Sequence, residues 1–436
     1  MTTHPLDPEE PTTSPTFRSL AHHNYRLYLA GSVVSNVGTW MQRVAQDWLV
    51  LSIPGNGGAE LGVTTGLQFL PILLLSPYAG VVADRFPKRR LLQLTQATMA
   101  LAALVLGVVA ALGAAQTWQV YLIAFAFGIG AAFDGPARQS FVSEMVGADD
   151  VTNAVGLNSA AFNSARIVGP ALAGVLIGLL GGGMTATGWV ILANAVSYLA
   201  VIVQLERMDT RALHSPKPSG RRPGMLVEGV RYVAGQPKML LIMVLVFFAG
   251  TFGMNFQMTS ALMATEVFGK GAGEYGVLGS ALAVGSLSGA LLAARRPRVR
   301  VRLLLVAATA FGLAEIVAGL LPTYVAFMLF SPLIGLSTIT LLNSANATLQ
   351  VESDPALRGR VMALYMTIVM GGTPLGAPVI GWIGEQYGAR WTLLAGGALV
   401  LVGVGLALAV HALATRRVAT PFRPSGTDLA APLSGR

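Results

Sequence analysis

The stretch GVVADRFPKRRLL, residues 80–92, places a glycine and a dense group of charges between two long apolar segments. The apolar segments each run about 20 residues, the length that crosses the hydrocarbon core of a bilayer. We therefore expect residues 80–92 to form a short charged loop between two membrane-spanning helices. The charged residues of this loop are Asp84, Arg85, Lys88, Arg89 and Arg90.

The composition of the whole chain agrees with a membrane location. Of the 436 residues, 53% are hydrophobic and 11% are charged, against roughly 25% charged in soluble domains. Apolar segments recur along nearly the whole chain and leave no room for a separate water-soluble domain. Because the chain has no cysteine, disulfides, thiolate metal sites and cysteine nucleophiles are excluded.

Apolar runs bounded by charges, proline and glycine predict twelve spanning helices. The first six lie near residues 27–53, 61–83, 91–113, 118–137, 154–180 and 187–205. The second six lie near residues 238–264, 275–294, 303–321, 323–348, 361–384 and 391–414.

The distribution of basic residues predicts the orientation. If the N-terminus is cytoplasmic, Lys270 and Arg390 fall in outer connections, and Arg43 and Arg166 lie within spans. The other 25 of the 29 basic residues then lie on the inner side, as the positive-inside rule requires. Both termini are therefore expected in the cytoplasm. The net charge of +9 is explained by topology, and we expect no nucleic-acid partner.

The chain divides into two halves and three polar segments. A basic, proline-containing loop separates the first six spans from the last six, and GPALAGVLIG (169–178) is similar to TPLGAPVIGW (373–382), which favours a duplicated unit. The expected ranges are 1–20 for a disordered tail, 21–205 for the first half, 206–237 for a cytoplasmic linker, 238–415 for the second half and 416–436 for a second disordered tail.

The loop at residues 80–92 resembles the signature loop of the major facilitator superfamily, although Pro87 stands where that superfamily usually has glycine. The resemblance implies an all-α membrane protein of twelve transmembrane helices in two pseudo-symmetric six-helix halves. It also implies a conformational latch, in which charged residues bridge neighbouring helix ends during alternating access. The residues of this predicted latch are Gly80, Asp84, Arg85, Lys88, Arg89 and Arg90.

Further segments resemble a branch of bacterial exporters that includes siderophore and macrolide efflux proteins. They are residues 17–51, FDGPARQSFVSEMV (133–146) and LRGRVMALY (357–365). GPALAG (169–174), with Gly169, Pro170 and Gly174, resembles the antiporter motif of the fifth span.

These resemblances imply a secondary transporter in a bacterial plasma membrane, which exports drugs, siderophores or secondary metabolites by proton antiport. Its expected partners are a small-molecule substrate, protons and the lipid bilayer, and it is expected to act as a monomer without a cofactor or metal. Two alternatives stay open, a proton-coupled uptake symporter and a non-transporting membrane sensor or scaffold. No nucleotide-binding or hydrolase motif with a fitting context occurs in the chain, so we expect no enzyme.

The first span carries a polar stripe that an isolated membrane helix would not tolerate. Its members follow steps of three and four residues and so share one helix face. A charge exposed to lipid costs about 2.5–3.5 kcal/mol or more at the midplane, so this face must point into the bundle or into a wet cavity. The stripe consists of Ser32, Ser35, Thr39, Gln42 and Gln46.

Arg43 and Asp47 lie beside this stripe, four residues apart, and are able to form a neutralising pair. One interpretation is a buried structural ion pair. The other makes Asp47 a proton-coupling carboxylate and makes Gln42, Arg43 and Gln46 contacts in the substrate cavity. Glu315 in the ninth span is the second candidate for proton coupling, or else a packing residue.

Arg166 in the fifth span has no acidic residue within one turn of its own helix. Its partner must therefore come from another span, from the substrate or from solvent. Because Arg43 and Arg166 outnumber Asp47 in the spans of the first half, one hypothesis is that substrates carry an acidic group. Asp134, at the inner end of the fourth span, is expected to pair with Arg138 or to cap a helix.

Overall fold

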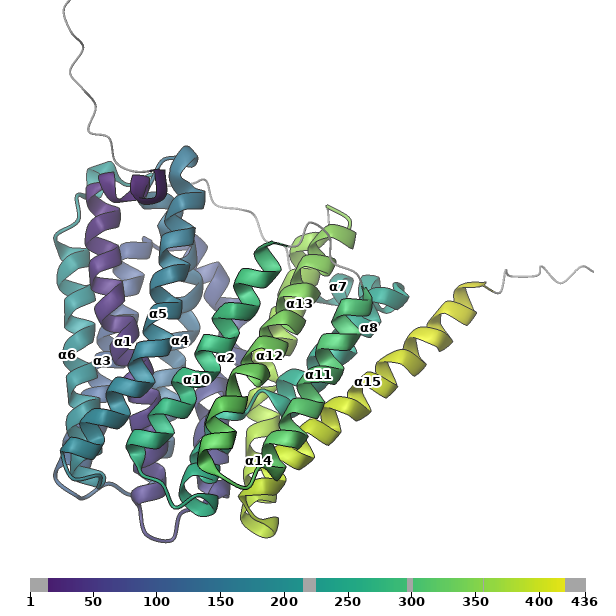
Figure 1. Ribbon diagram of the computed structural model, residues 1–436. Coiled ribbons are helices and arrows are strands. Elements are labelled where there is room, and N and C mark those ends of the chain that lie inside the picture. The colour runs from purple at the N-terminus through teal and green to yellow at the C-terminus, as the bar shows by residue number, and fades with distance from the viewer. Residues whose placement is uncertain (1–14, 215–224, 296–300, 356, 420–436) are drawn as a thin grey trace, which may run out of the picture.

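The computed structural model describes residues 15–214, 225–295, 301–355 and 357–419 (Figure 1). Within these ranges, eleven helical segments are long and apolar enough to cross a bilayer. One further helix, α1 (His23–Ser52), runs beside them for 30 residues. The described residues thus contain all twelve predicted spans.

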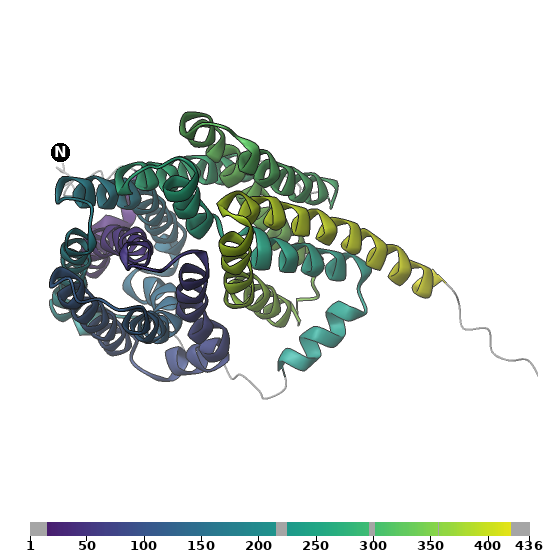
Figure 2. The ribbon, with the colours of Figure 1, turned by 90° about the horizontal axis from the view of Figure 1, so that it is seen from below.

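Six helices form the first half, which is on the left in Figure 1 and closes into a ring in Figure 2. Their cores are built from small and aliphatic side chains that pack helix against helix. They are α1, α2 (Gly58–Arg85), α3 (Lys88–Ala111), α4 (Thr117–Met145), α5 (Val151–Leu179) and α6 (Met184–Glu206).

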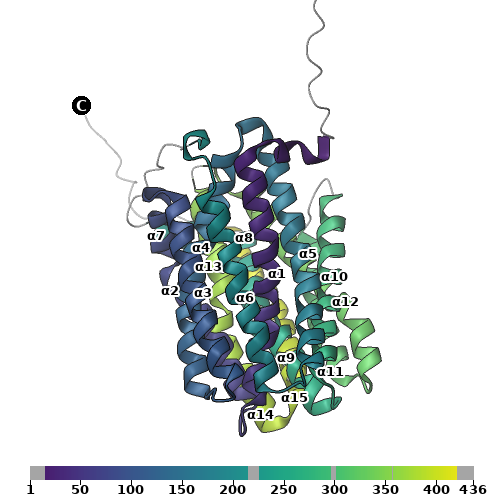
Figure 3. The same cartoon turned by 90° about the vertical axis from the view of Figure 1, so that its left-hand side faces the viewer.

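Helix α1 is not among the eleven segments because polar and charged side chains lower its hydropathy. It packs against α5 and α6 (Figure 3), and 15 of its residues are buried, many of them polar. Enclosure by neighbouring helices therefore permits this sequence within the membrane, as the polar stripe predicted.

The second half contains the other six spans, and two of them are discontinuous. The seventh span consists of α8 (Pro237–Phe248), the π-helix η4 (Ala249–Gly253), α9 (Phe256–Leu262) and the π-helix η5 (Met263–Val267). The eleventh consists of α13 (Arg358–Gly371) and α14 (Thr373–Tyr387). The uninterrupted spans are α10 (Ala272–Ala294), α11 (Val301–Leu320), α12 (Tyr324–Glu352) and α15 (Ala389–Ala419).

One side chain forms hydrogen bonds to the backbone at the break in the seventh span. The Asn255 amide nitrogen donates to the Thr251 carbonyl at 2.9 Å and to the Phe252 carbonyl at 3.2 Å, which satisfies backbone groups near the break. Gly372 and Gly376 of the eleventh span lie so close to Thr251 that a Cβ on either would overlap with it. The two discontinuous spans therefore pack against each other at their breaks.

Two helices extend into segments expected to be tails. Pro15–Ala21 form a 3-10 helix, η1, in the segment expected to be a disordered tail, because Arg18 and Ser19 contact Asp150 and Asn153. Helix α15 also continues to Ala419, beyond the expected end of the second half. The rest of the expected tails, 1–14 and 420–436, lies outside the described residues.

The expected linker, residues 206–237, contains a helix, α7 (Met225–Ala234). This helix docks on the start of α13, where Glu228 pairs with Arg360 and the Tyr232 hydroxyl accepts from the Asp354 amide at 3.2 Å. A 3-10 helix, η3 (Thr210–Ala212), precedes it, and residues 215–224 lie outside the described part of the chain.

The halves contact each other closely at the end of the molecule opposite η1, the lower end in Figure 1. Glycines permit this approach, because a Cβ on Gly58 of α2 would lie 2.6 Å from the Gly381 carbonyl oxygen of α14. On the other side of the interface, a Cβ on Gly174 of α5 would lie 2.5 Å from the Ala272 carbonyl oxygen of α10. The Ser280 hydroxyl of α10 also donates to the Ile167 carbonyl at 2.5 Å.

Candidate functional site

The polar stripe of α1 faces the interior of the first half. Ser32, Ser35, Gln42 and Gln46 are each at most 2% exposed, and each bonds to a side chain from another helix. This confirms the predicted interior position and satisfies the polar groups inside the bundle. The contacts are Ser32 with Arg138 at 3.1 Å, Ser35 with Gln96 at 3.4 Å, Thr39 with Tyr198 at 3.1 Å, Gln42 with Asn194, and Gln46 with Gln68 at 3.3 Å.

A buried charged cluster lies at the start of this stripe. Arg138 and Asp134 form an ion pair at 2.9 Å on α4, as one of the two expectations for Asp134 proposed. Thr95 and Gln96 of α3 donate to the same carboxylate at 3.0 and 2.8 Å. Sequence reasoning missed these two residues, although polar side chains within an apolar span are the signal that identifies such partners.

Asp47 bonds to the second half of the molecule. Its carboxylate, 6% exposed, accepts from the Tyr275 hydroxyl of α10 at 2.6 Å and from the Gln257 amide of α9 at 2.7 Å. Trp48 stacks on the Tyr275 ring with centroids 6.5 Å apart. Asp47 is therefore a hydrogen-bonded link between the halves, near the end where they meet.

Arg43 and Asp47, which could have formed a neutralising pair, do not contact each other directly. Within the described residues these two side chains form no ion pair, because the Asp47 carboxylate is directed to Gln257 and Tyr275. The Arg43 guanidinium instead lies over the Trp40 ring, 4.8 Å from its centroid, and near Phe69 at 5.5 Å. Arg166 approaches the same Trp40 ring at 5.6 Å.

Glu315 lies in α11 and is 2% exposed. Among the described residues its Oε2 atom has no hydrogen-bond partner, and a Cβ on Gly396 of α15 would lie 3.3 Å from that oxygen. The two candidates for proton coupling, Asp47 and Glu315, thus belong to different halves. Asp47 bonds to Gln257 and Tyr275, and Glu315 lies at the contact between α11 and α15.

The charged loop between α2 and α3 connects helix ends within the first half. Lys88 bonds to Glu144 at the end of α4 at 2.5 Å. Arg89 bonds to Glu206 at the end of α6 at 2.7 Å, and to the Leu205 carbonyl at 2.6 Å. In the rest of the predicted latch, Gly80 is buried, Asp84 is half-buried, and Arg85 and Arg90 are exposed.

The antiporter-like motif of α5 lies where α5 meets α1 and α10. A Cβ on Gly169 would lie 2.5 Å from the Trp40 Cβ of α1. Pro170 lies under Gly279 of α10, whose added Cβ would lie 3.1 Å from it. Gly174 lies against Ala272 of α10. The motif therefore lets α5 pack closely against α1 in its own half and against α10 in the other half.

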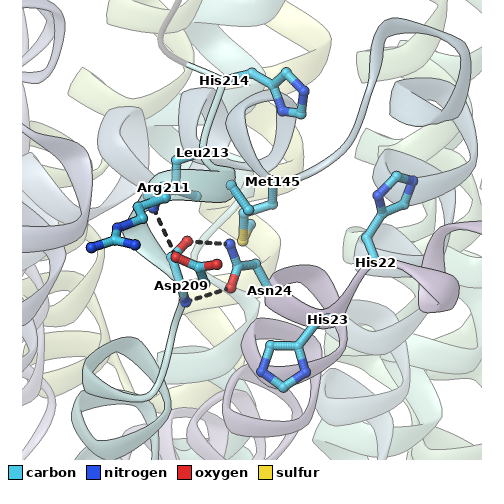
Figure 4. A pocket seen from close by; sticks show the side chains of 9 residues that line it. His22, His23, Asn24, Met145, Asp209, Arg211, Leu213 and His214 are labelled. Carbon is cyan, nitrogen blue, oxygen red and sulfur yellow. Dashed lines mark hydrogen bonds between the residues drawn. The ribbon is translucent and has the colours of Figure 1, made fainter.

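A cavity of about 580 Å³ lies beside η3, at the end of the molecule that carries η1 (Figure 4). Asn24 and Asp209 cross it through two hydrogen bonds of 2.8 and 2.9 Å. Three histidines, His22, His23 and His214, also line it, but no group of residues in the described chain could hold a metal ion. This cavity does not include the predicted site residues.

A family model described as "Transmembrane secretion effector" matches residues 14–423. The chain belongs to this family of the major facilitator superfamily. The family assignment confirms the resemblance carried by residues 80–92. As a member of the transmembrane secretion effector family, the protein is a multi-pass membrane transporter of small molecules and not an enzyme.

Relatives with assigned activities are similar over most of their length. The "Multidrug efflux pump Tap" of Mycobacterium tuberculosis is 30% identical over 402 residues, covering 87% of this chain and 91% of the relative. The "Staphyloferrin A transporter" of Staphylococcus aureus is 24% identical over 370 residues, covering 83% and 90%.

A solved structure shares the fold of this transmembrane secretion effector. It is a bacterial homologue of the human lysosomal transporter Spinster in an inward-facing, occupied conformation. The TM-score is 0.68 with 18% identity, and the match covers 93% of this chain and 98% of that chain. The likeness supports the twelve-helix, two-half arrangement.

Proposed function

We propose that this protein exports small amphipathic molecules in exchange for protons by alternating access. The observation that carries the proposal is the Asp47 carboxylate, which links the halves through Tyr275 and Gln257. The relative named as a multidrug efflux pump supports export, and the staphyloferrin A transporter supports transport of a small molecule. A drug, a siderophore or a secondary metabolite is the expected substrate.

The orientation is part of the proposal. Basic residues concentrate at the end that carries η1 and α7, so we place that end and both termini in the cytoplasm of a bacterial cell. The opposite end, where the halves meet, then faces outward and is closed in this conformation. Residues 21–205 and 238–415 act as the two rocking halves of one monomer.

Asp47 is the proposed coupling residue. When ionised, it accepts two hydrogen bonds from the second half, and such bonds to a charged acceptor are the stronger ones, so they hold the outer end closed. When the halves separate, Asp47 becomes accessible to protons from outside. Protonation neutralises the carboxylate and weakens its hydrogen bonds to Tyr275 and Gln257. Closure of the outer end re-forms both bonds and expels the proton toward the cytoplasmic side, so the cycle moves a proton inward while substrate moves outward.

The other predicted residues have supporting roles. Gln42, Gln46, Arg43 and Arg166 are proposed to contribute to the substrate cavity, and Glu315 to be a second proton carrier. Gly169, Pro170 and Gly174 are proposed to form the sliding surface of α5. We propose that the loop at residues 80–92 acts as a latch, with Lys88 and Arg89 fixing the inner ends of the first half in this conformation.

The proposal is tested in inverted membrane vesicles with an acidic interior, using a panel of macrolides, cationic dyes and aromatic acids. We expect wild-type vesicles to accumulate at least one compound. Asp47→Asn, which keeps the size and polarity of the side chain, should abolish accumulation driven by the pH gradient while equilibrium binding remains.

The matched control is Asp149→Asn, because Asp149 is exposed at the opposite end and should retain full accumulation. Gradient-driven accumulation by Asp47→Asn at the wild-type rate would exclude Asp47 as the coupling residue. Accumulation only in right-side-out vesicles with an acidic exterior would support an uptake symporter instead.

A further inference from the structure

Two arginine side chains lie against one tryptophan ring in the first half. The guanidinium carbon of Arg43 lies 4.8 Å from the Trp40 ring centroid, and that of Arg166 lies 5.6 Å from it. Cation–π contacts hold both groups in place. The arrangement therefore concentrates two positive charges around a single aromatic plane.

Neither guanidinium forms an ion pair at contact distance with a carboxylate in the described part of the chain. The nearest acid by sequence, Asp47, accepts its bonds from Tyr275 and Gln257. The Nε atom of Arg43 is buried and makes no hydrogen bond with a described residue. An uncompensated buried charge is costly, and Asp47 acts on Arg43 only through space, so the two positive charges favour binding of an anion.

The position of Arg166 permits access. It lies near the middle of α5 and shares a helix face with Ser159 and Asn163, at steps of four and three residues. Ser159 is exposed and Asn163 half-buried. Since polar side chains avoid lipid at this depth, we expect this face of α5 to line a hydrated path rather than the bilayer.

Aromatic rings surround the two arginines. Phe69 of α2 lies 5.5 Å from the Arg43 guanidinium, and Phe162 of α5 meets the Trp40 ring edge-on with centroids 5.8 Å apart. Phe162 is 45% exposed and so offers its ring to a ligand. The rings favour a flat apolar body, and the guanidiniums favour a carboxylate, which they bind in a bidentate manner.

We propose that Arg43, Arg166 and Trp40, with Phe69 and Phe162, form a subsite for the carboxylate end of an aromatic acid. This inference rests on the proposed transport function, because it names the acidic group by which a transported molecule is held. It also gives the hypothesis of acidic substrates a defined location between α1, α2 and α5.

The subsite is tested by equilibrium binding to the full chain in nanodiscs of phosphatidylcholine, without any pH gradient. The probes are 1-naphthoate and its neutral analogue 1-naphthamide. We expect wild type to bind 1-naphthoate more tightly than 1-naphthamide. Arg166→Gln and Arg43→Gln should each weaken 1-naphthoate binding about tenfold or more, as expected for a lost bond to a charged group.

Binding of 1-naphthamide should stay within about twofold of the wild-type value in both variants, which also shows that they fold. Arg43→Lys should restore part of the 1-naphthoate affinity, because it keeps the charge but loses the bidentate geometry. The matched control is Arg26→Gln, since Arg26 is an exposed arginine at the start of the same helix and should change neither probe.

Equal binding of both probes by wild type, or an equal loss of both in Arg166→Gln, would overturn the proposal. Competitive displacement of 1-naphthoate by phosphatidylglycerol in the nanodisc would assign the arginines to a lipid headgroup and would also overturn it. The measurement is separate from proton coupling, because Asp47→Asn should bind 1-naphthoate as wild type does.

Discussion

At the scale of the residue, the account depends on what Asp47 contacts. The sequence identified Asp47, Arg43 and Arg166 because charges within apolar spans are costly and must be compensated. It did not identify Gln257 and Tyr275, which lie 210 and 228 residues away from Asp47 along the chain. Helical spacing predicts contacts within one helix, and these contacts exist only once the two halves have packed together.

Tyr275→Phe tests the contact between Tyr275 and Asp47, because it removes only the hydroxyl oxygen of Tyr275. Its loss removes a hydrogen bond to a charged group, worth about 1.5–3 kcal/mol, so the outer end should open more often. The readout is the rate at which a membrane-impermeant maleimide labels Ala377→Cys in intact cells, since Ala377 is 0% exposed beneath Gly62. We expect labelling to be about tenfold faster in the variant.

Tyr324→Phe is the matched control. The Tyr324 hydroxyl donates to the Glu274 carbonyl at 2.9 Å, which is a bond within the second half, so its loss should not open the outer end. Equal labelling rates in Tyr275→Phe and Tyr324→Phe would show that the Asp47 link does not restrain the halves.

At the scale of the element, the spans could be predicted and their interruptions could not. Apolar runs of sufficient length located all twelve spans, because the bilayer fixes their length. The π-helical segment η4 lies where glycines of the eleventh span approach Thr251, and apolar composition does not record this contact. Helix α7 was not predicted, because the basic and proline residues of this segment indicated only a loop.

The side of the membrane on which α7 lies is open to a direct measurement. The chain has no cysteine, so Val230→Cys, on the exposed face of α7, and Ala114→Cys, in the α3–α4 loop, each provide one thiol. We expect impermeant maleimide to label Ala114→Cys in intact cells and Val230→Cys only after permeabilisation. The reverse pattern would invert the proposed topology.

At the scale of the whole molecule, the sequence predicted two halves but not which end of them is closed. The duplicated glycine-rich segments indicated the halves, and both segments lie in the contacts between helices. Closure is a property of how the halves pack, and a transporter must adopt more than one packing. The close contacts of α2 with α14 and of α5 with α10 define the packing seen here.

The central claim is that the ionised Asp47 holds the outer end closed and that a proton releases it. It is tested most directly by pulsed electron–electron distance measurements between spin labels on Ala114→Cys and Gln386→Cys, at the outer ends of the two halves. We predict that the wild-type distance distribution shifts to longer distances as the pH falls, and that Asp47→Asn gives the long distances at every pH. A wild-type distribution that does not change with pH, or an Asp47→Asn distribution that still changes with pH as wild type does, would contradict the account.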